Sequence, residues 1–256
     1  MIKDEVSDLL LGFGIKNSDT VLMHTSLKAI GNIEEGLDAF IDGFIEYLSD
    51  GTYIIPTHTW ANVNEDNPVF DVRTTQPCIG LLPTVAVKRA DGVRSLHPTH
   101  SVVAFGKRAK EYVRGEEKCT SPAPPFGAWA RLIDENAKIL LVGVGLNRNT
   151  FIHAVDEILD LPNKLVEPIP LTIIGYDGEE YHTNFRKHGT TGSENYGVFY
   201  KPLIYAGALS VGKLRNATVL CVDAKKCSEE IKRLYSVATY DLTKEEVEIP
   251  ENYYKF

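Results

Sequence analysis

The sequence has few cysteines and no long apolar run, and these absences exclude several classes of protein. Its four cysteines, at positions 78, 119, 221 and 227 of 256, form no C-x-x-C pair. Four thiols are too few for a disulfide scaffold of this length, which favours a reducing, cytoplasmic compartment. Apolar runs such as residues 139–146 are far too short for a membrane span, and the acidic first residues do not resemble a signal peptide. We therefore expect no membrane association.

The chain also lacks the dense basic stretches of a nucleic-acid-binding protein. It has 27 Lys and Arg residues against 35 Asp and Glu residues, a formal net charge of −8. Phosphate neutralisation needs a Lys/Arg face, so nucleic acid is excluded as a partner. With 43% hydrophobic and 24% charged residues, the composition is that of a globular protein with a sizeable core.

Helical and strand-like segments alternate along the chain, with one hairpin signal at Asp177-Gly178. This alternation predicts an α/β fold with helices layered on both sides of a central mixed sheet. We expect one domain over residues 1–256, with a candidate internal boundary at the proline-rich residues 162–170. Strands are expected at 20–27, 52–57, 101–106, 138–146 and 217–224, and helices at 3–11, 34–49, 82–89, 107–114, 129–135, 150–159, 198–208 and 228–235. Asn149 is the expected N-cap of the helix at 150–159, and residues 57–79 are expected to form a long loop.

Two glycine-rich segments imitate nucleotide-binding motifs, and both fail. Gly143-Val-Gly145 follows an expected strand, but Arg148 stands at the third glycine position of the dinucleotide fingerprint. Residues 207–213 imitate a phosphate loop, but Leu214 replaces the hydroxyl residue that holds Mg²⁺. Neither segment predicts a nucleotide site.

Three histidines stand in patterns that have a chemical interpretation. His97 and His100 are three residues apart, but Pro98 between them opposes a shared helical face, so backbone hydrogen bonding is favoured over metal ligation. His153 lies three residues before Asp156 and four before Glu157 on an expected helix. Either carboxylate can then face the imidazole, which would leave its other nitrogen free as a general base.

Two further segments have side chains suited to a cofactor or a cleft. The turn at residues 24–31 (HTSLKAIG) leaves a strand and enters a helix, where hydroxyls, backbone N–H groups and Lys28 can hold phosphates. The segment 121–128 (SPAPPFGA) is either a rigid surface turn or the wall of a cleft. For both segments, the alternative interpretation is an ordinary turn at the protein surface.

Taken together and in order, HTSLKAIG, GTYIIPTHTW, RSLHPTHSVVAFG, TSPAPPFGAW, ILLVGVG and NTFIHAVDE resemble the aminoglycoside 3-N-acetyltransferase family. The similarity covers about residues 20–160 and is thin beyond Leu161. It implies an α/β/α acyltransferase fold, acetyl-CoA as cosubstrate, no metal, and direct transfer to an amine of an amino sugar.

The resemblance also implies roles for individual residues. His153 matches the family's histidine and would be the base, with Asp156 at the family's acid position and Glu157 beside it. The implied coenzyme A contacts are His24, Thr25, Ser26, Leu27, Lys28, Ser101, Ser121, Phe126 and Gly127. The implied acceptor contacts are Thr57, His58, Trp60 and Asn62.

The identity of the acceptor stays open between two classes of amine. Arg186, Lys187 and His188 could meet the phosphates of a nucleotide-linked amino sugar used in cell-surface polysaccharide biosynthesis, which we take as the first expectation. A polycationic aminoglycoside, with antibiotic resistance as the outcome, is the alternative. A metal-dependent hydrolase and an amino-sugar-binding module are more remote. A homo-oligomer is compatible with the sequence.

Overall fold

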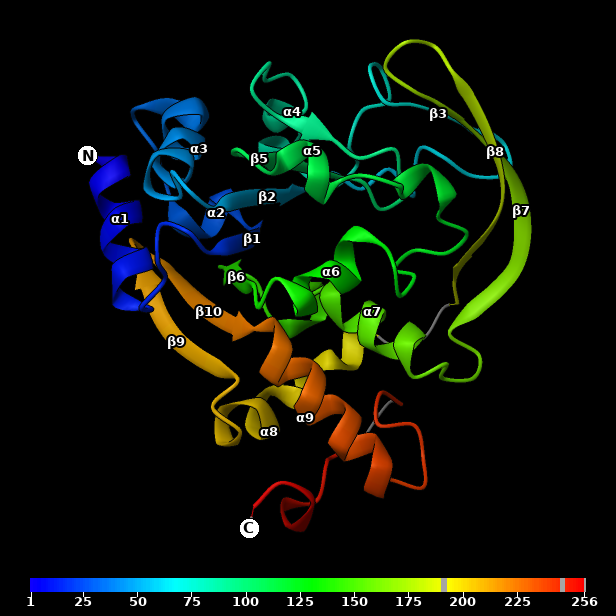
Figure 1. Ribbon diagram of the computed structural model, residues 1–256. Helices are drawn as coiled ribbons and strands as arrows, with labels where there is room; N and C mark the ends of the chain where they lie inside the picture. Colours follow the sequence, from blue (N-terminus) through cyan, green and yellow to red (C-terminus); the bar gives the residue numbers. More distant parts are fainter. Residues whose placement is uncertain (190–192, 245–246, 256) are drawn as a thin grey trace.

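The computed structural model describes residues 1–189, 193–244 and 247–255, and its described elements form three layers (Figure 1). The middle layer is a seven-stranded sheet with the strand order β4-β5-β2-β1-β6-β10-β9. Its strands are β1 (Thr20–Thr25), β2 (Thr52–Pro56), β4 (Val93–Arg94), β5 (Val102–Phe105), β6 (Lys138–Val142), β9 (Leu209–Leu214) and β10 (Ala217–Asp223). The central strands β2, β1 and β6 are parallel, and the flanking strands pair antiparallel. The sheet is therefore mixed, as the sequence predicts.

Helices cover both faces of this sheet. One layer contains α1 (Ile2–Gly12), α2 (Leu27–Ile30), α3 (Gly36–Tyr47) and α4 (Leu81–Ala86). The other contains α5 (Ala109–Tyr112), α6 (Ala128–Asp134), α7 (Phe151–Ile158), α8 (Tyr200–Tyr205) and α9 (Ala224–Val237). Short 3-10 helices lie at η1 (Glu116–Lys118), η2 (Leu146–Arg148), η3 (Ser193–Phe199) and η4 (Glu251–Tyr253).

The strands are apolar along their whole length because both of their faces are covered. In β6, Ile139 and Leu141 pack in the α6–α9 core, whereas Leu140 and Val142 pack in the α1–α4 core. This alternation follows from the period of two along a strand. A continuous apolar run in the sequence is the expected signal of such a doubly covered parallel strand.

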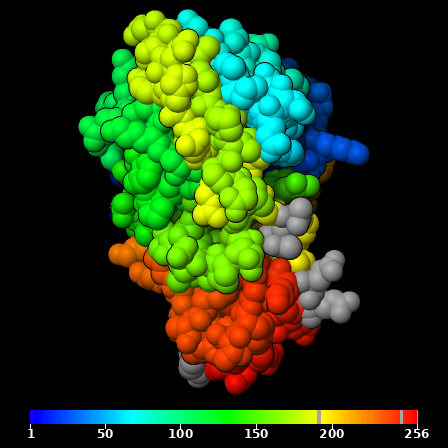
Figure 2. Space-filling model, turned by 90° about the vertical axis from the view of Figure 1, so that its right-hand side faces the viewer, coloured from blue at the N-terminus to red at the C-terminus, as the bar shows by residue number. Residues whose placement is uncertain are grey.

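A separate three-stranded sheet lies at one side of the molecule, in the order β3-β7-β8. The strands β7 (Leu165–Ile174) and β8 (Glu180–His188) form the expected hairpin, with Gly178 at φ 82° in its turn. β3 (Val69–Asp71), from within the long loop, pairs parallel with β7. Figure 2 shows the hairpin lying beside the cyan segment that contains β3.

Most of the expected elements are present, β9 is an additional strand, and two expectations need correction. The expected loop at 57–79 contains the strand β3. Local sequence does not reveal this strand, because its pairing partner β7 is about a hundred residues away. β9 occupies the segment that imitates a phosphate loop, where it forms the sheet edge beside β10. Thr150, not Asn149, is the N-cap of α7. In the part of the chain that the structure describes, no helix is long and apolar enough to cross a membrane.

Candidate active site

A cavity of about 700 Å³ opens where the parallel strands β1, β2 and β6 end. Its lining includes the last residues of β1 and β2, the segment between β6 and α7, α7 itself, and the end of β8. Helix-covered parallel sheets place ligands beyond the carboxyl ends of their strands. The cavity therefore occupies the position where this fold class binds its substrates.

The turn after β6 depends on a glycine. Gly143 has φ 67°, and a Cβ atom there would lie 2.3 Å from the Cβ of Ala29 in α2. Only glycine permits this backbone conformation and this close approach. The Gly143-Val-Gly145 sequence thus packs α2 against the turn that leads to α7.

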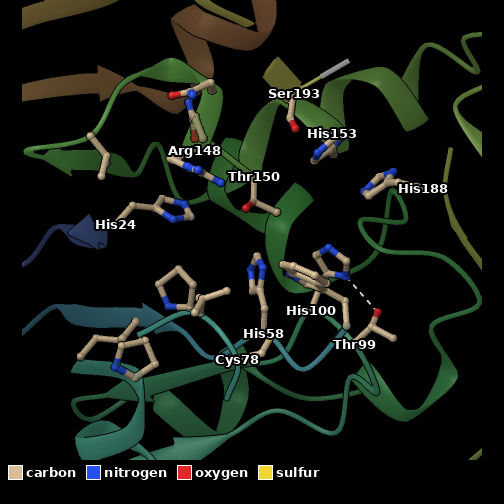
Figure 3. A pocket seen from close by; sticks show the side chains of 18 of the residues that line it. His24, His58, Cys78, Thr99, His100, Arg148, Thr150, His153, His188 and Ser193 are labelled. Atoms are coloured by element: carbon tan, nitrogen blue, oxygen red, sulfur yellow. Dashed lines mark hydrogen bonds between the residues drawn. The ribbon is translucent and has the colours of Figure 1, made fainter. Parts of the chain in front are cut away.

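Histidine rings gather around the cavity. Six of the seven histidines are connected by ring contacts, directly or through Trp129. Five of them line the cavity: His24, His58, His100, His153 and His188 (Figure 3). Burial lowers the pKa of each of these five rings, so they are neutral at pH 7.

His153, on the first turn of α7, is held by a hydrogen-bonded chain to Asp156. The hydroxyl of Tyr196 in η3 lies 2.6 Å from Asp156 Oδ2 and 2.7 Å from His153 Nδ1. Tyr196 has a single proton and donates it to the carboxylate, so its oxygen accepts the Nδ1 proton of His153. This arrangement leaves His153 Nε2 as an unprotonated acceptor. Burial raises the pKa of Asp156 to about 6.

Glu157, one residue further along α7, has different partners. Its carboxylate accepts hydrogen bonds from Ser121 Oγ at 2.5 Å and from the backbone N–H of Ala123 at 2.8 Å. It therefore fixes the 121–128 segment rather than His153. Burial raises the pKa of Glu157 to about 7, although both hydrogen bonds oppose the rise.

His97 is a structural residue. Its Nδ1 accepts hydrogen bonds from the backbone N–H groups of Thr99 and His100, and its Nε2 donates to the carbonyl of Ser121. Both ring nitrogens are therefore occupied by the backbone, as the sequence analysis favoured, and His97 has no lone pair for a metal. Among the described residues, no group of three or more His, Cys, Asp or Glu side chains is arranged to hold a metal ion.

The residues expected at coenzyme A lie in several environments. His24 and Thr25 line the cavity. The next three, Ser26, Leu27 and Lys28, lie in or before α2 and do not line it. Ser101 is fully buried and donates to the carbonyl of Thr57, so it has no surface for a ligand.

The residues of the 121–128 segment also do not line the cavity. Ser121 is buried against Glu157, Gly127 is the N-cap of α6, and Phe126 is 49% exposed. Of these three, only Phe126 offers an accessible side chain. The loop is thus a neighbour of the site whose position is set from α7.

Of the four residues expected to contact the acceptor, two line the cavity and two do not. His58 and Trp60 line the cavity, and Trp60 is 51% exposed at its mouth. Thr57 is fully buried and does not line the cavity, and its hydroxyl pairs with that of Ser101 at 2.9 Å. Asn62 is exposed and donates to the carbonyl of Gln76, so it braces the loop instead of facing the cavity.

Three residues of the site have no role in the sequence pattern around His153: His188 and Arg148, which line the cavity, and Tyr196, which contacts His153 without lining the cavity. Tyr196 and His188 follow His153 in sequence by 43 and 35 residues, and Arg148 stands at the third glycine position of the failed dinucleotide fingerprint. No local spacing rule connects Tyr196 or His188 to α7, because the connection runs through β7 and β8. Their signal is a Tyr and a His within one polar segment, FRKHGTTGSENY.

Several buried polar atoms of the residues that line the cavity have no hydrogen-bond partner in the part of the chain that the structure describes. They are His24 Nε2, Thr25 Oγ1, His58 Nε2, His188 Nε2 and both side-chain atoms of Asn149. Buried polar groups without partners are rare in folded proteins unless a ligand or water completes them. These atoms mark the wall as a binding surface for a polar molecule.

The comparisons with known proteins identify the family of this chain. A sequence model described as aminoglycoside 3-N-acetyltransferase matches residues 22–236. The chain belongs to the aminoglycoside 3-N-acetyltransferase family. This match extends well beyond Leu161, where the similarity seen in the sequence is thin. The family is one of acyltransferases, which is the class that the motifs predict.

Two curated relatives illustrate the degree of similarity. Aminoglycoside N(3)-acetyltransferase III of Serratia marcescens is 27% identical over 188 residues, which cover 66% of this chain and 69% of that protein. Aminoglycoside N(3)-acetyltransferase IX of Micromonospora chalcea is 27% identical over 182 residues, covering 64% of this chain and 63% of the relative. The sequence match thus spans about two thirds of these relatives. Their names support the aminoglycoside alternative over the nucleotide-linked amino sugar that the sequence analysis put first.

Solved structures confirm the fold. A mutant of aminoglycoside acetyltransferase AAC(3)-IVa in complex with a gentamicin has a TM-score of 0.78 and 22% identity, covering 92% of this chain and 88% of that one. AAC-IIIb in a binary complex with CoASH has a TM-score of 0.76 and 18% identity, covering 89% and 93%. The layered α/β/α architecture expected from the sequence is therefore that of the aminoglycoside acetyltransferases.

Proposed function

We propose that this protein transfers the acetyl group of acetyl-CoA to an amine of an amino sugar, with His153 as general base. The observation that carries the proposal is the chain His153–Tyr196–Asp156 at the wall of the cavity, in a member of this family. A protonated amine cannot attack a thioester, so the neutral amine is the reacting form, and a base must take the N–H proton that the nitrogen loses as the amide forms. His153 Nε2 is free to do so because Nδ1 is engaged by Tyr196.

The reaction proceeds by direct transfer in this scheme. The amine nitrogen forms a bond to the thioester carbon, and its proton passes to His153 Nε2. The C–S bond breaks, and the proton then passes to the thiolate of coenzyme A. Asp156 stabilises the transient imidazolium through the hydroxyl of Tyr196. Asn149, whose side-chain amide has no partner, is a suitable donor to the thioester oxygen as negative charge develops there.

The 121–128 segment and Arg148 are the groups we assign to the cosubstrate. Arg148 lines the cavity with an exposed guanidinium, and no described residue pairs with it. Guanidinium groups bind phosphates through paired hydrogen bonds. Glu157 fixes Ser121 and Ala123 and thereby the loop that carries Phe126.

The experiment that tests the activity is a thiol-release assay with acetyl-CoA and a panel of amines. The panel contains gentamicin, kanamycin, glucosamine and a nucleotide-linked amino sugar, each with and without protein. Thiol release that depends on both the amine and His153 supports the proposal. Absence of amine-dependent release across the panel, with folded protein that binds coenzyme A, contradicts it.

The charges on the cavity wall favour a second candidate within the same reaction, an acceptor with few positive charges. The described lining has two cations, Arg148 and Lys187, and one carboxylate, Glu194. Residues 190–192, which complete that segment of sequence, carry no ionisable side chain. A polycationic aminoglycoside gains most where several carboxylates oppose its ammonium groups. Faster turnover of glucosamine than of gentamicin would favour this candidate, and the reverse order would favour an aminoglycoside.

A further inference from the structure

His188, at the end of β8, lies face to face with the base. The ring centroids of His153 and His188 are 3.7 Å apart, with an angle of 26° between the planes. The ring of His100 is nearly perpendicular to that of His188, with the two ring centroids 5.4 Å apart. Figure 3 shows His153 and His188 next to each other on the upper wall of the cavity. The proposed mechanism gives His188 no role.

The His188 ring is fixed in place but keeps one nitrogen unused. Register pairing with Leu165 holds its backbone, and the N–H of Gly189 donates to the carbonyl of Lys164 at 2.8 Å. The His188 side chain lines the cavity, and its buried Nε2 has no hydrogen-bond partner among the described residues. A buried ring nitrogen without a partner, beside the base, points to a contact that the ligand supplies.

The geometry of a reacting amine defines that contact. A primary amine that attacks a carbonyl directs its lone pair at the carbon, and it has two N–H bonds on the other side. His153 Nε2 can take one of them. We propose that His188 Nε2 accepts the second N–H, so that the two stacked imidazoles hold the acceptor amine by both of its hydrogens. This inference rests on the proposed acetyl transfer.

The two histidines then have different fates in the reaction. The proton held by His153 leaves the amine and passes on to the thiolate, whereas the hydrogen held by His188 remains on the amide nitrogen of the product. His188 therefore acts as a binding residue and never exchanges a proton with the substrate. Burial, with smaller contributions from the neighbouring His97 and Lys164, lowers the pKa of His188 to about 3, so its lone pair is available at neutral pH.

If His188 binds the second N–H, the enzyme should prefer a primary amine to the corresponding secondary amine, which has only one N–H. The test compares the best amine of the thiol-release panel with the same molecule methylated at the reacting nitrogen, in wild type and in His188→Phe. Phenylalanine keeps a ring against His153 but has no lone pair. The wild type should prefer the primary amine, and His188→Phe should shrink this preference in kcat/KM about 3- to 10-fold, the worth of one hydrogen bond between neutral groups.

The controls separate this contact from a structural role. His182→Phe changes an exposed histidine on the same strand and should leave the preference unchanged. If His188→Phe lowers kcat/KM for both amines by one factor, or changes neither, the inference is overturned. His188→Ala measured on the same pair replaces the phenylalanine variant if that variant does not melt cooperatively. Failure of the wild type to acetylate any amine would instead remove the proposed function.

Discussion

The cavity has two histidine-bearing walls, and their ring nitrogens do different work. At the β4–β5 connection, His97 uses both nitrogens on the backbone, and His100 Nδ1 pairs with Thr99 Oγ1 at 2.8 Å. At α7 and β8, His153 uses only Nδ1 and His188 leaves Nε2 without a partner. Burial and a lowered pKa are common to both walls. Both histidines of the reactive wall keep a ring nitrogen available, whereas His97 on the structural wall has both nitrogens bound to the backbone; pKa shifts alone would not show this difference.

The two neighbouring acids of α7 also have different partners. Asp156 reaches His153 through Tyr196, whereas Glu157 reaches across to the 121–128 segment. Adjacent positions on a helix point about 100° apart, so one residue faces η3 and the other faces the loop. The first prediction tests the reactive wall, and the others test how far its partners and the structural wall share in the activity.

Removal of the base should have the largest effect. We expect His153→Ala to lower kcat by about 10²- to 10⁴-fold, because proton removal from the amine then has no positioned acceptor. The affinity for coenzyme A, measured by calorimetry, should stay nearly unchanged. A kcat within a few-fold of wild type would show that another group is the base, with His188 the first to examine.

Breaking the hydrogen-bonded chain from His153 to Asp156 should lower kcat less than His153→Ala does, and it should also change the pH profile. In wild type we expect the rate to fall below about pH 6, where the Asp156 carboxylate becomes protonated. Asp156→Asn removes that titration and weakens the imidazolium, so the pKa of His153 falls and the acidic limb moves to lower pH, with a kcat lower by about 10- to 100-fold. Tyr196→Phe should lower kcat similarly. An unchanged acidic limb in Asp156→Asn would exclude the carboxylate from the mechanism.

Substitution on the structural wall should affect stability more than chemistry. His97→Ala leaves the N–H groups of Thr99 and His100 and the carbonyl of Ser121 without their buried partner. We expect a loss of about 2–4 kcal/mol in the free energy of unfolding, measured by urea denaturation. The kcat of the folded variant should remain within about 5-fold of wild type. A loss of activity as large as that of His153→Ala at full stability would place His97 in the chemistry.

The sequence predicts the layers and the base, but not the partners of the base. Continuous apolar strands and amphipathic helices have local periods, so the central sheet and α7 are readable without the structure. The spacing to Asp156 and Glu157 identifies His153, yet that spacing does not distinguish the two acids. The difference arises from Tyr196 and Ser121, which contact different faces of α7 and are distant from it in sequence. Contacts of this kind depend on tertiary packing, as does the parallel pairing of β3 with β7.

The smallest effect is expected at Glu157. Glu157→Gln keeps an acceptor for the Ala123 N–H, and the hydroxyl of Ser121 can turn to pair with the amide, so kcat should stay within about 3-fold of wild type. The variant should change the pH dependence of stability instead. Burial raises the pKa of Glu157 from 4.5 to about 7, so the folded state binds the proton more tightly than the unfolded chain does.

That stabilising contribution is complete below about pH 4.5 and is lost as the pH rises through about 7. Relative to wild type, Glu157→Gln should therefore gain stability between pH 4.5 and 7, as measured by urea denaturation at a series of pH values. The buried histidines contribute the opposite slope, but they are common to both proteins and cancel in the difference. If Glu157→Gln instead lowers kcat more than Asp156→Asn does, then Glu157, acting through the 121–128 segment, is the acid on which catalysis depends.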